Sequence, residues 1–170
     1  MAKSKVRRAI VTPDKHFPYE DKPAIQALIK AIKLVKPDIY VDLGDVGEWE
    51  SVSMWKWKRK KQPPLEVMIP DVEKDIEAVN RGMDLIVRVK KALKLDERGY
   101  TYHPFGKFLK IGKLFFYHGH QYGGQYHAAN HLRKLGCNVM YGHWHDLQQM
   151  SATHMDGPKS AWSIGCLKDM

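Results

Sequence analysis

The sequence predicts an α/β fold, and three observations carry this prediction. A strand, an amphipathic helix and a second strand follow one another in residues 7–43, which is the order of a right-handed βαβ unit. Short apolar runs and helical patterns continue to alternate along the rest of the chain. Four polar clusters stand where apolar runs end, and loops at strand ends are where α/β proteins hold ligands.

The βαβ unit is predicted from the N-terminal quarter of the chain. Residues 7–12 (RRAIVT) form a short apolar strand that ends at a proline. From Pro23 to Val35, apolar residues recur at helical spacing, and the proline stands near the start, where helices tolerate it. Lys36-Pro37 ends this helix, and residues 38–43 (DIYVDL) then form a buried strand.

Helices and strands also alternate in the remainder of the chain. The segment around Trp55 is expected to be a short helix ended by Pro63-Pro64. A long helix is expected from Val72 to about Leu93, with Asp71 as its N-cap. The later predictions are a hairpin over 108–111 and 114–117, a helix over 125–135 that stops at Gly136, and strands over 139–141, 147–153 and 160–164.

Length and composition predict a single soluble domain over residues 1–170. Hydrophobic residues make up 44% and charged residues 28%, as in ordinary globular proteins, and the length allows a buried core. No apolar run approaches the roughly 20 residues that span a bilayer, and the N-terminus lacks the apolar stretch of a signal peptide. We therefore expect a cytoplasmic protein with no membrane partner, and a homo-oligomer stays open.

The net charge of +9 favours polyanionic partners such as DNA or RNA. Part of the excess lies in one segment, where basic residues alternate with Trp55 and Trp57. Basic side chains neutralise phosphates and indoles stack on bases, so this segment predicts contact with nucleic acid. A solvated surface loop is the alternative interpretation, because basic surface carries no specificity. The basic residues are Lys56, Lys58, Arg59, Lys60 and Lys61.

Carboxylates and imidazoles dominate the four clusters at the strand ends. These ligands suit a pair of divalent ions of the Mn, Fe or Zn type. Asp45 follows a glycine that permits a tight turn, and it is our candidate to bridge two ions. Two ions neutralise a phosphate, align it and activate water, so the clusters predict a metal-dependent phosphoesterase. The clusters are Asp14-Lys15-His16, Gly44-Asp45, His118-Gly119-His120 and Gly142-His143-Trp144-His145.

In this order, the clusters resemble the calcineurin-like metallophosphoesterases, and phage and bacterial members in particular. The signature of that family is D-x-H, G-D, G-N-H, an H-G-H type segment and G-H-x-H, and the chain matches every motif except G-N-H. The resemblance implies a two-sheet αββα sandwich, here shortened. It also implies a hydrolase with two divalent ions, a phosphodiesterase or nuclease that acts on nucleic acid or nucleotides.

The same resemblance implies which residues bind metal. One ion would be held by Asp14, His16, Asp45 and His145, and the second by Asp45, His118 and His143. His120 would lie just outside these ligands as a catalytic residue that contacts substrate or orients a ligand. The other histidines, His103, His127, His131 and His154, are interpreted as surface or core-edge residues.

The missing G-N-H motif leaves alternatives open. In the family its Asn ligates the second metal and its His stabilises charge on the phosphate. Asn80 and Asn130 are expected inside helices and do not replace it. The second metal site is then weak or empty, or another subunit supplies the ligand. Two functions follow: an enzyme of reduced activity, or a catalytically impaired remnant that acts as a basic nucleic-acid or protein interaction module.

Overall fold

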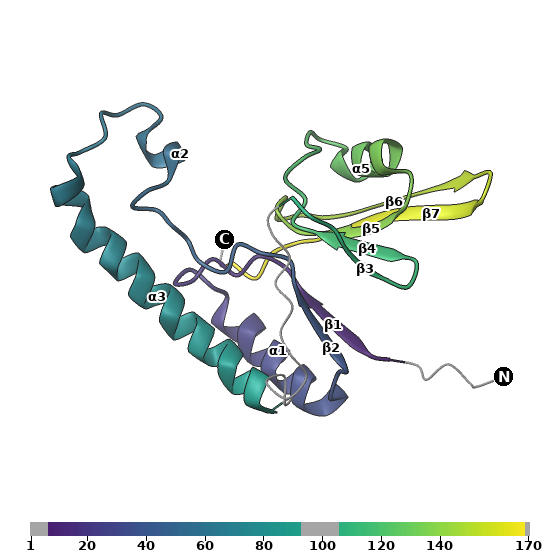
Figure 1. The fold of residues 1–170 in the computed structure, drawn as a ribbon, viewed down its shortest axis with the longest axis horizontal. Helices are drawn as coiled ribbons and strands as arrows, with labels where there is room; N and C mark the ends of the chain where they lie inside the picture. Colours follow the sequence, from purple (N-terminus) through teal and green to yellow (C-terminus); the bar gives the residue numbers. More distant parts are fainter. Residues whose placement is uncertain (1–6, 93–105, 169–170) are drawn as a thin grey trace.

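The computed structural model describes residues 7–92 and 106–168 and confirms a mixed α/β fold (Figure 1). The N-terminal part contains β1 (Ala9–Thr12), α1 (Lys22–Val35), β2 (Ile39–Asp42), α2 (Met54–Trp57) and α3 (Leu65–Ala92). The C-terminal part contains β3 (Leu109–Ile111), β4 (Leu114–Tyr117), α5 (His127–Leu135), β5 (Asn138–Tyr141), β6 (Leu147–His154) and β7 (Gly157–Ile164).

The strands form two separate sheets. β1 and β2 make a parallel pair, and the other five strands form a sheet in the order β3-β4-β5-β7-β6. In this larger sheet β4, β5 and β7 run parallel, whereas β3 and β6 are antiparallel edge strands. β1, β2, β4 and β5 each lead into one of the four polar clusters. Because carboxyl ends of parallel strands share an edge, this topology gathers the clusters in two pairs, one at the edge of each sheet.

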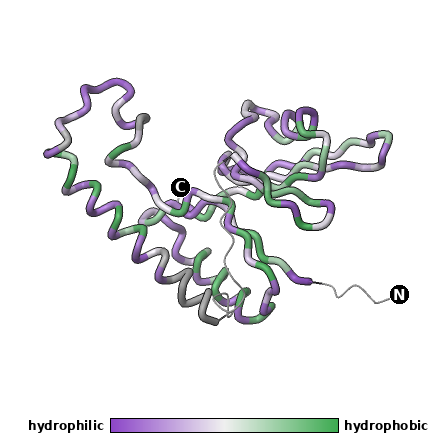
Figure 2. The backbone as a smooth tube through the Cα atoms, in the orientation of Figure 1, coloured by the Kyte–Doolittle hydropathy of each residue, from purple (hydrophilic) through white to green (hydrophobic). Residues whose placement is uncertain are grey.

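Apolar residues pack these elements into layers. α1 covers the small sheet through Ile32, and α5 covers the large sheet through Leu132. A third apolar cluster joins the two sheets, with Val41 and Leu43 packed against Phe116. The hydrophobic stretches in Figure 2 follow the strands of both sheets, as buried strands require. The two sheets are therefore joined by apolar packing, with α1 on one and α5 on the other.

Caps fix the start of α1 and the end of α5, and the predicted stop at Gly136 is confirmed. The Asp21 side chain accepts a hydrogen bond of 2.9 Å from the backbone N–H of Ala24 at the start of α1. Gly136 ends α5 with a φ of 59° and donates its N–H to the carbonyl of Leu132. No helix in residues 7–92 and 106–168 is long and apolar enough to cross a membrane.

The long helix starts earlier than predicted, at Leu65 instead of Val72. The prediction took Asp71 as the N-cap, and this assignment was wrong, because α3 runs through both Pro70 and Asp71. A proline this close to a helix start removes only one backbone hydrogen bond. Burial of Met68 (5% exposed) favours the extra turns, since its apolar side chain leaves water only if the helix begins before it.

Candidate metal centre

The four polar clusters meet between the two sheets, and their side chains fall into two groups. Within each group, one potential ligand atom per residue lies within 4.8 Å of the others. The first group is Asp14, His16 and His145, and the second is Asp45, His118 and His143. These six residues are the ones that the sequence predicts as metal ligands, so the structure brings together side chains up to 131 positions apart, from Asp14 to His145.

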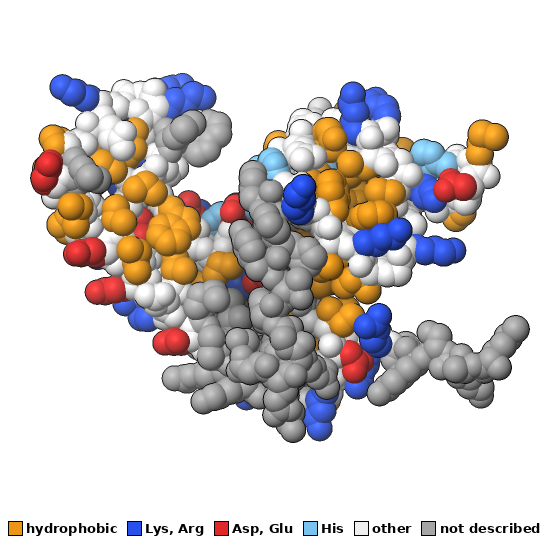
Figure 3. Space-filling model, viewed as in Figure 1, with side chains coloured by type: hydrophobic (Ala, Val, Ile, Leu, Met, Phe, Trp, Pro, Cys, Tyr) orange, Lys and Arg blue, Asp and Glu red, His pale blue; other side chains and the backbone are white. Residues whose placement is uncertain are grey.

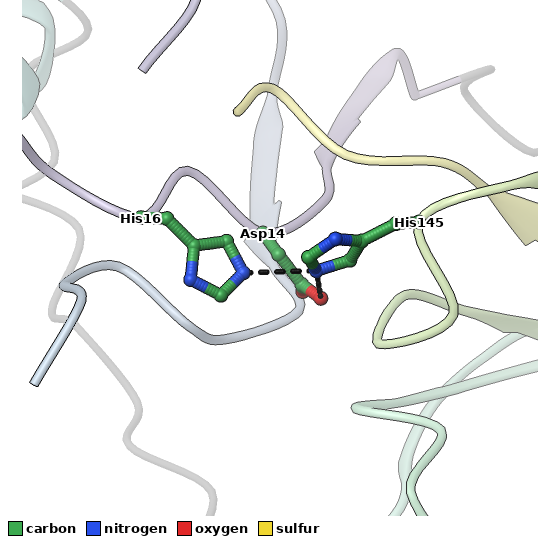
Figure 4. A group of neighbouring side chains, drawn as sticks. All are labelled: Asp14, His16 and His145. Carbon is green, nitrogen blue, oxygen red and sulfur yellow. Dashed lines mark hydrogen bonds and ion pairs between the residues drawn. The ribbon is translucent and has the colours of Figure 1, made fainter. Parts of the chain in front are cut away.

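In the first group, two imidazoles point at each other beside a buried carboxylate (Figure 4). Nε2 of His16 lies 2.9 Å from Nε2 of His145, which is 3.7 Å from Oδ2 of Asp14. A metal–nitrogen distance of about 2.1 Å places two nitrogens on one ion about 3.0 Å apart at an octahedral angle and about 3.4 Å apart at a tetrahedral one. The spacing of these imidazole nitrogens therefore fits a shared ion.

The second group repeats this geometry on the neighbouring loops. Nε2 of His118 lies 3.0 Å from Nδ1 of His143 and 3.4 Å from Oδ2 of Asp45. The same Asp45 oxygen is 4.0 Å from Nε2 of His16, a member of the first group. Asp45 thus stands between the two groups, which is the position that a bridging carboxylate occupies.

Four of these six residues have strained backbones. His16, Asp45, His143 and His145 have φ values of 52°, 40°, 70° and 53°. Residues other than glycine rarely adopt this left-handed region, and such strain gathers at functional sites. In residues 7–92 and 106–168 the remaining non-glycine case is Lys36, which caps the end of α1. These loops therefore adopt unfavourable backbone conformations that direct their side chains toward the site.

Asp14 is fully buried, and its surroundings suit a cation. Oδ2 accepts a 2.7 Å hydrogen bond from the backbone N–H of His143, whereas Oδ1 is buried and has no hydrogen-bond partner in the described parts of the chain. Burial raises the pKa of this carboxyl to about 7. A Cβ on Gly142 would lie 2.7 Å from Oδ1, so the glycine keeps space beside that oxygen. A metal ion would stabilise the buried carboxylate.

The imidazoles are largely prepared for ligation. Burial lowers the pKa of His16, His143 and His145, which favours the neutral form that binds metals. Burial also acts to lower the pKa of His118, but the hydrogen bond and charge of Asp45 outweigh it and raise that pKa overall. A metal ion would take the place of the His118 proton between these two side chains. The six residues present therefore fit a pair of divalent ions.

Outer partners fix the orientation of two of these rings. Nδ1 of His16 lies 2.9 Å from Oε2 of Glu48, an ion-pair contact outside hydrogen-bond geometry, and the same oxygen is 2.7 Å from Nζ of Lys168. Nδ1 of His118 donates to the carbonyl of Leu43 at 3.1 Å. Metal-binding histidines commonly hold their second nitrogen in this way, which directs the other nitrogen at the ion. Glu48 is only weakly indicated by its position soon after Asp45, and no sequence pattern indicates Lys168.

Replacement of Glu48 by glutamine should lower metal affinity at the first group about 10- to 100-fold, because His16 loses the carboxylate that orients it. The matched control is Glu50→Gln, since Glu50 bonds to Tyr19 at 3.0 Å and not to a ligand. Calorimetric titration of the metal-free variants with Mn²⁺ or Zn²⁺ measures the effect. Equal affinity losses in both variants would contradict a specific role for Glu48.

His120 lies beside the second group, as predicted, without joining it. Its ring centre is 6.0 Å from that of His118 and 6.4 Å from that of His143. For two other histidines, the interpretation as surface or core-edge residues was wrong. His127 and His131 are buried in α5, at 2% and 0% exposure, because their rings pack inward beneath the site loops. His103 lies outside the described residues, and His154 is partly exposed at the end of β6.

The asparagines lie elsewhere, as predicted. Asn130 donates to the carbonyl of Gly123 and accepts from Arg133, and Asn138 accepts from the N–H of Ser160. Asn80 is exposed on α3. The bonds of Asn130 and Asn138 therefore go to residues outside both groups. The second group therefore offers three protein ligands where the family pattern has four.

The predicted basic segment is exposed on α2 and the turn that follows it. Figure 3 shows Lys and Arg side chains at the tip of the arm formed by α2 and the start of α3, across a hollow from the lobe that carries α5. Trp57 is half-buried, and its Nε1 donates to the carbonyl of Ser51 at 3.1 Å. The exposed residues are Lys56, Lys58, Arg59, Lys60 and Lys61.

Comparison of the chain with protein-family models, curated proteins and solved structures found no match. The family resemblance of the four clusters stays a prediction. The function is therefore inferred from the geometry of the site and the chemistry of its side chains.

Proposed function

We propose that this protein is a metal-dependent phosphoesterase of the calcineurin-like type, a hydrolase with the corresponding two-sheet sandwich. One observation carries the proposal: two three-residue groups of metal-binding side chains lie side by side, with Asp45 between them. Isolated pairs of histidines and acids are common on protein surfaces. Two adjacent groups that draw on four loops, with strained backbones at four positions, are not explained by turn formation alone.

The side chains divide into ligands and a nearby acid or donor. Asp14, His16 and His145 would hold one Mn, Fe or Zn ion, His118 and His143 the other, and Asp45 would contact both. When bound, the ions supply charge neutralisation and a water of lowered pKa. His120 stands beside the second group, where its ring nitrogen can donate a hydrogen bond to a phosphate oxygen or to the leaving group.

The substrate that we favour is a phosphodiester of nucleic acid or a nucleotide. The chain carries a net charge of +9, and an exposed basic segment stands at the tip of the arm across the hollow in Figure 3. A polyanion attracted by this segment would be held near the metal centre.

The proposal is tested by elemental analysis after loading with Mn²⁺ or Zn²⁺ and exhaustive desalting, followed by assays on a chromogenic phosphodiester and on single-stranded DNA and RNA. We expect close to two bound ions per chain and hydrolysis of the phosphodiester substrates. Near zero ions per folded chain would overturn the proposal.

The missing asparagine favours a second candidate function, a basic module that binds nucleic acid without turnover. It is distinguished from the first by binding in the absence of hydrolysis. In both cases the basic segment should contribute to affinity.

Replacement of four basic residues by glutamine (Lys58, Arg59, Lys60 and Lys61) should weaken binding of single-stranded DNA or RNA at least tenfold. The slope of log affinity against log salt should fall by up to about 3, because each lost phosphate contact removes roughly 0.7 from it. Fluorescence anisotropy between low and moderate salt measures both quantities.

The matched control removes four exposed lysines from the other side of the molecule and leaves the basic segment intact. These lysines are Lys22, Lys30, Lys33 and Lys36, on and just after α1. An equal loss of affinity in the control would show that net charge alone acts, and that the α2 segment is not a binding surface.

A further inference from the structure

Two hydrogen bonds tie together two of the loops that carry the candidate ligands. The backbone N–H of Gly142 donates to the carbonyl of His118 at 3.0 Å, and the other bond comes from a side chain. Nε1 of Trp144 donates to the carbonyl of Gly119 at 3.0 Å. Trp144 stands between His143 and His145, and Gly119 stands between His118 and His120. The side-chain bond therefore joins the middle residues of the two loops, although neither residue offers a metal ligand.

A buried histidine of α5 faces the same carbonyl but cannot replace the indole. Nε2 of His131 lies 3.2 Å from the Gly119 carbonyl, and its Nδ1 lies 2.7 Å from the carbonyl of His127. Both nitrogens face acceptors, whereas a neutral imidazole has a single N–H. Burial lowers the pKa of His131 and so favours the neutral ring. We assign that N–H to the nitrogen with the shorter contact, Nδ1, which faces the carbonyl of His127. The carbonyl of Gly119 then accepts its side-chain hydrogen bond from the N–H of Trp144.

The indole is held in one orientation by its neighbours. Its ring stacks on that of His127, at 5.4 Å between centres and 20° between planes. His127 donates from Nε2 to Asp146 and accepts at Nδ1 from the hydroxyl of Tyr141, both at 2.7 Å. A Cβ on Gly123 would lie 2.4 Å from the indole, so that glycine leaves the space that the ring fills. Trp144 is thus a rigid donor.

The two groups of ligands depend differently on this tie. His118 and His143, 3.0 Å apart in the second group, come from the two tied loops. In the first group only His145 comes from them, because Asp14 and His16 belong to the loop after β1. We propose that Trp144 is a positioning residue that sets the geometry of the second group through the carbonyl of Gly119. This inference rests on the proposed metal centre.

The test compares Trp144→Phe with Trp57→Phe, since each variant removes one indole N–H bonded to a backbone carbonyl, and Trp57 lies outside the site. Co²⁺ is titrated into the metal-free proteins, and the two binding steps are followed by calorimetry and visible absorption. Trp144→Phe should weaken one of the two steps about 10- to 100-fold and alter its absorption spectrum, while the other step stays unchanged. Trp57→Phe should leave both steps unchanged.

Benzothienylalanine at position 144 provides a second variant, because sulfur replaces the N–H in a ring of nearly the same shape. It should reproduce the loss if Trp144→Phe proves unstable. If the wild type binds Co²⁺ in two steps and both position-144 variants bind it with the same two affinities, the positioning role is overturned and the proposed function stands. An equal loss in Trp57→Phe would also overturn it. If the wild type binds only one ion, there is no second metal site and this inference fails. If it binds none, the proposed function fails as well.

Discussion

Replacement of Asp45 by asparagine should abolish phosphodiester hydrolysis, with kcat/KM reduced about a thousand-fold or more. The carboxylate lies 3.4 Å from His118 and 4.0 Å from His16, and so between the two groups. Its loss would remove an anionic ligand that both ions share, and several kcal/mol of transition-state stabilisation corresponds to roughly three powers of ten in rate. Bound metal should also fall below the wild-type number per chain.

Asparagine is the informative substitution at this position. The backbone of Asp45 has a φ of 40°, which asparagine tolerates better than alanine, so the loop keeps its path. The carboxylate is also 43% exposed, and its replacement leaves no cavity. Asp156→Asn makes the same chemical change at an exposed turn beyond β6 and should retain full activity. Hydrolysis by Asp45→Asn at the wild-type rate would show that the reaction takes place elsewhere.

The candidate ligands can be picked out from the sequence because they stand in short local patterns. Asp14 and His16 stand two positions apart after one strand, and His143 and His145 repeat that spacing after another. Parallel pairing of β1 with β2 and of β4 with β5 brings the strand ends together within each sheet. Each group draws on both sheets, so the packing of Val41 and Leu43 on Phe116, which joins the sheets, is also needed and is not encoded in any spacing.

The supporting residues were not predictable in the same way. His131 and Trp144 meet at the carbonyl of Gly119 only because α5 folds back over the large sheet. No residue spacing in the sequence predicts a contact between an indole, an imidazole and a backbone oxygen. The early start of α3 has a similar cause, since burial of Met68 through tertiary packing overrides the local signal of Pro70.

Replacement of Asp14 by asparagine should separate stability from metal binding. Burial raises the pKa of Asp14 from 3.8 to about 7 in the metal-free fold, so the folded state binds more protons than the unfolded state between these values. The contribution of Asp14 to stability is therefore fully present below about pH 4 and is lost as the pH rises through about 7. An asparagine has no charge to bury and should keep its contribution at every pH.

At pH 8 we therefore expect the metal-free Asp14→Asn protein to unfold several degrees above the metal-free wild type, and the difference should vanish near pH 4. Added Mn²⁺ or Zn²⁺ should reverse the order, because binding to the native state stabilises the wild type and the variant lacks a ligand of the first group. Differential scanning calorimetry over this pH range, with and without metal, measures both effects, with Asp156→Asn as the exposed control. Two results would show that the Asp14 carboxylate is a structural group: a variant less stable than the metal-free wild type at pH 8, or a variant whose unfolding temperature rises with metal as much as that of the wild type. Only a carboxylate held in place for a cation destabilises the metal-free fold and stabilises the metal-bound one.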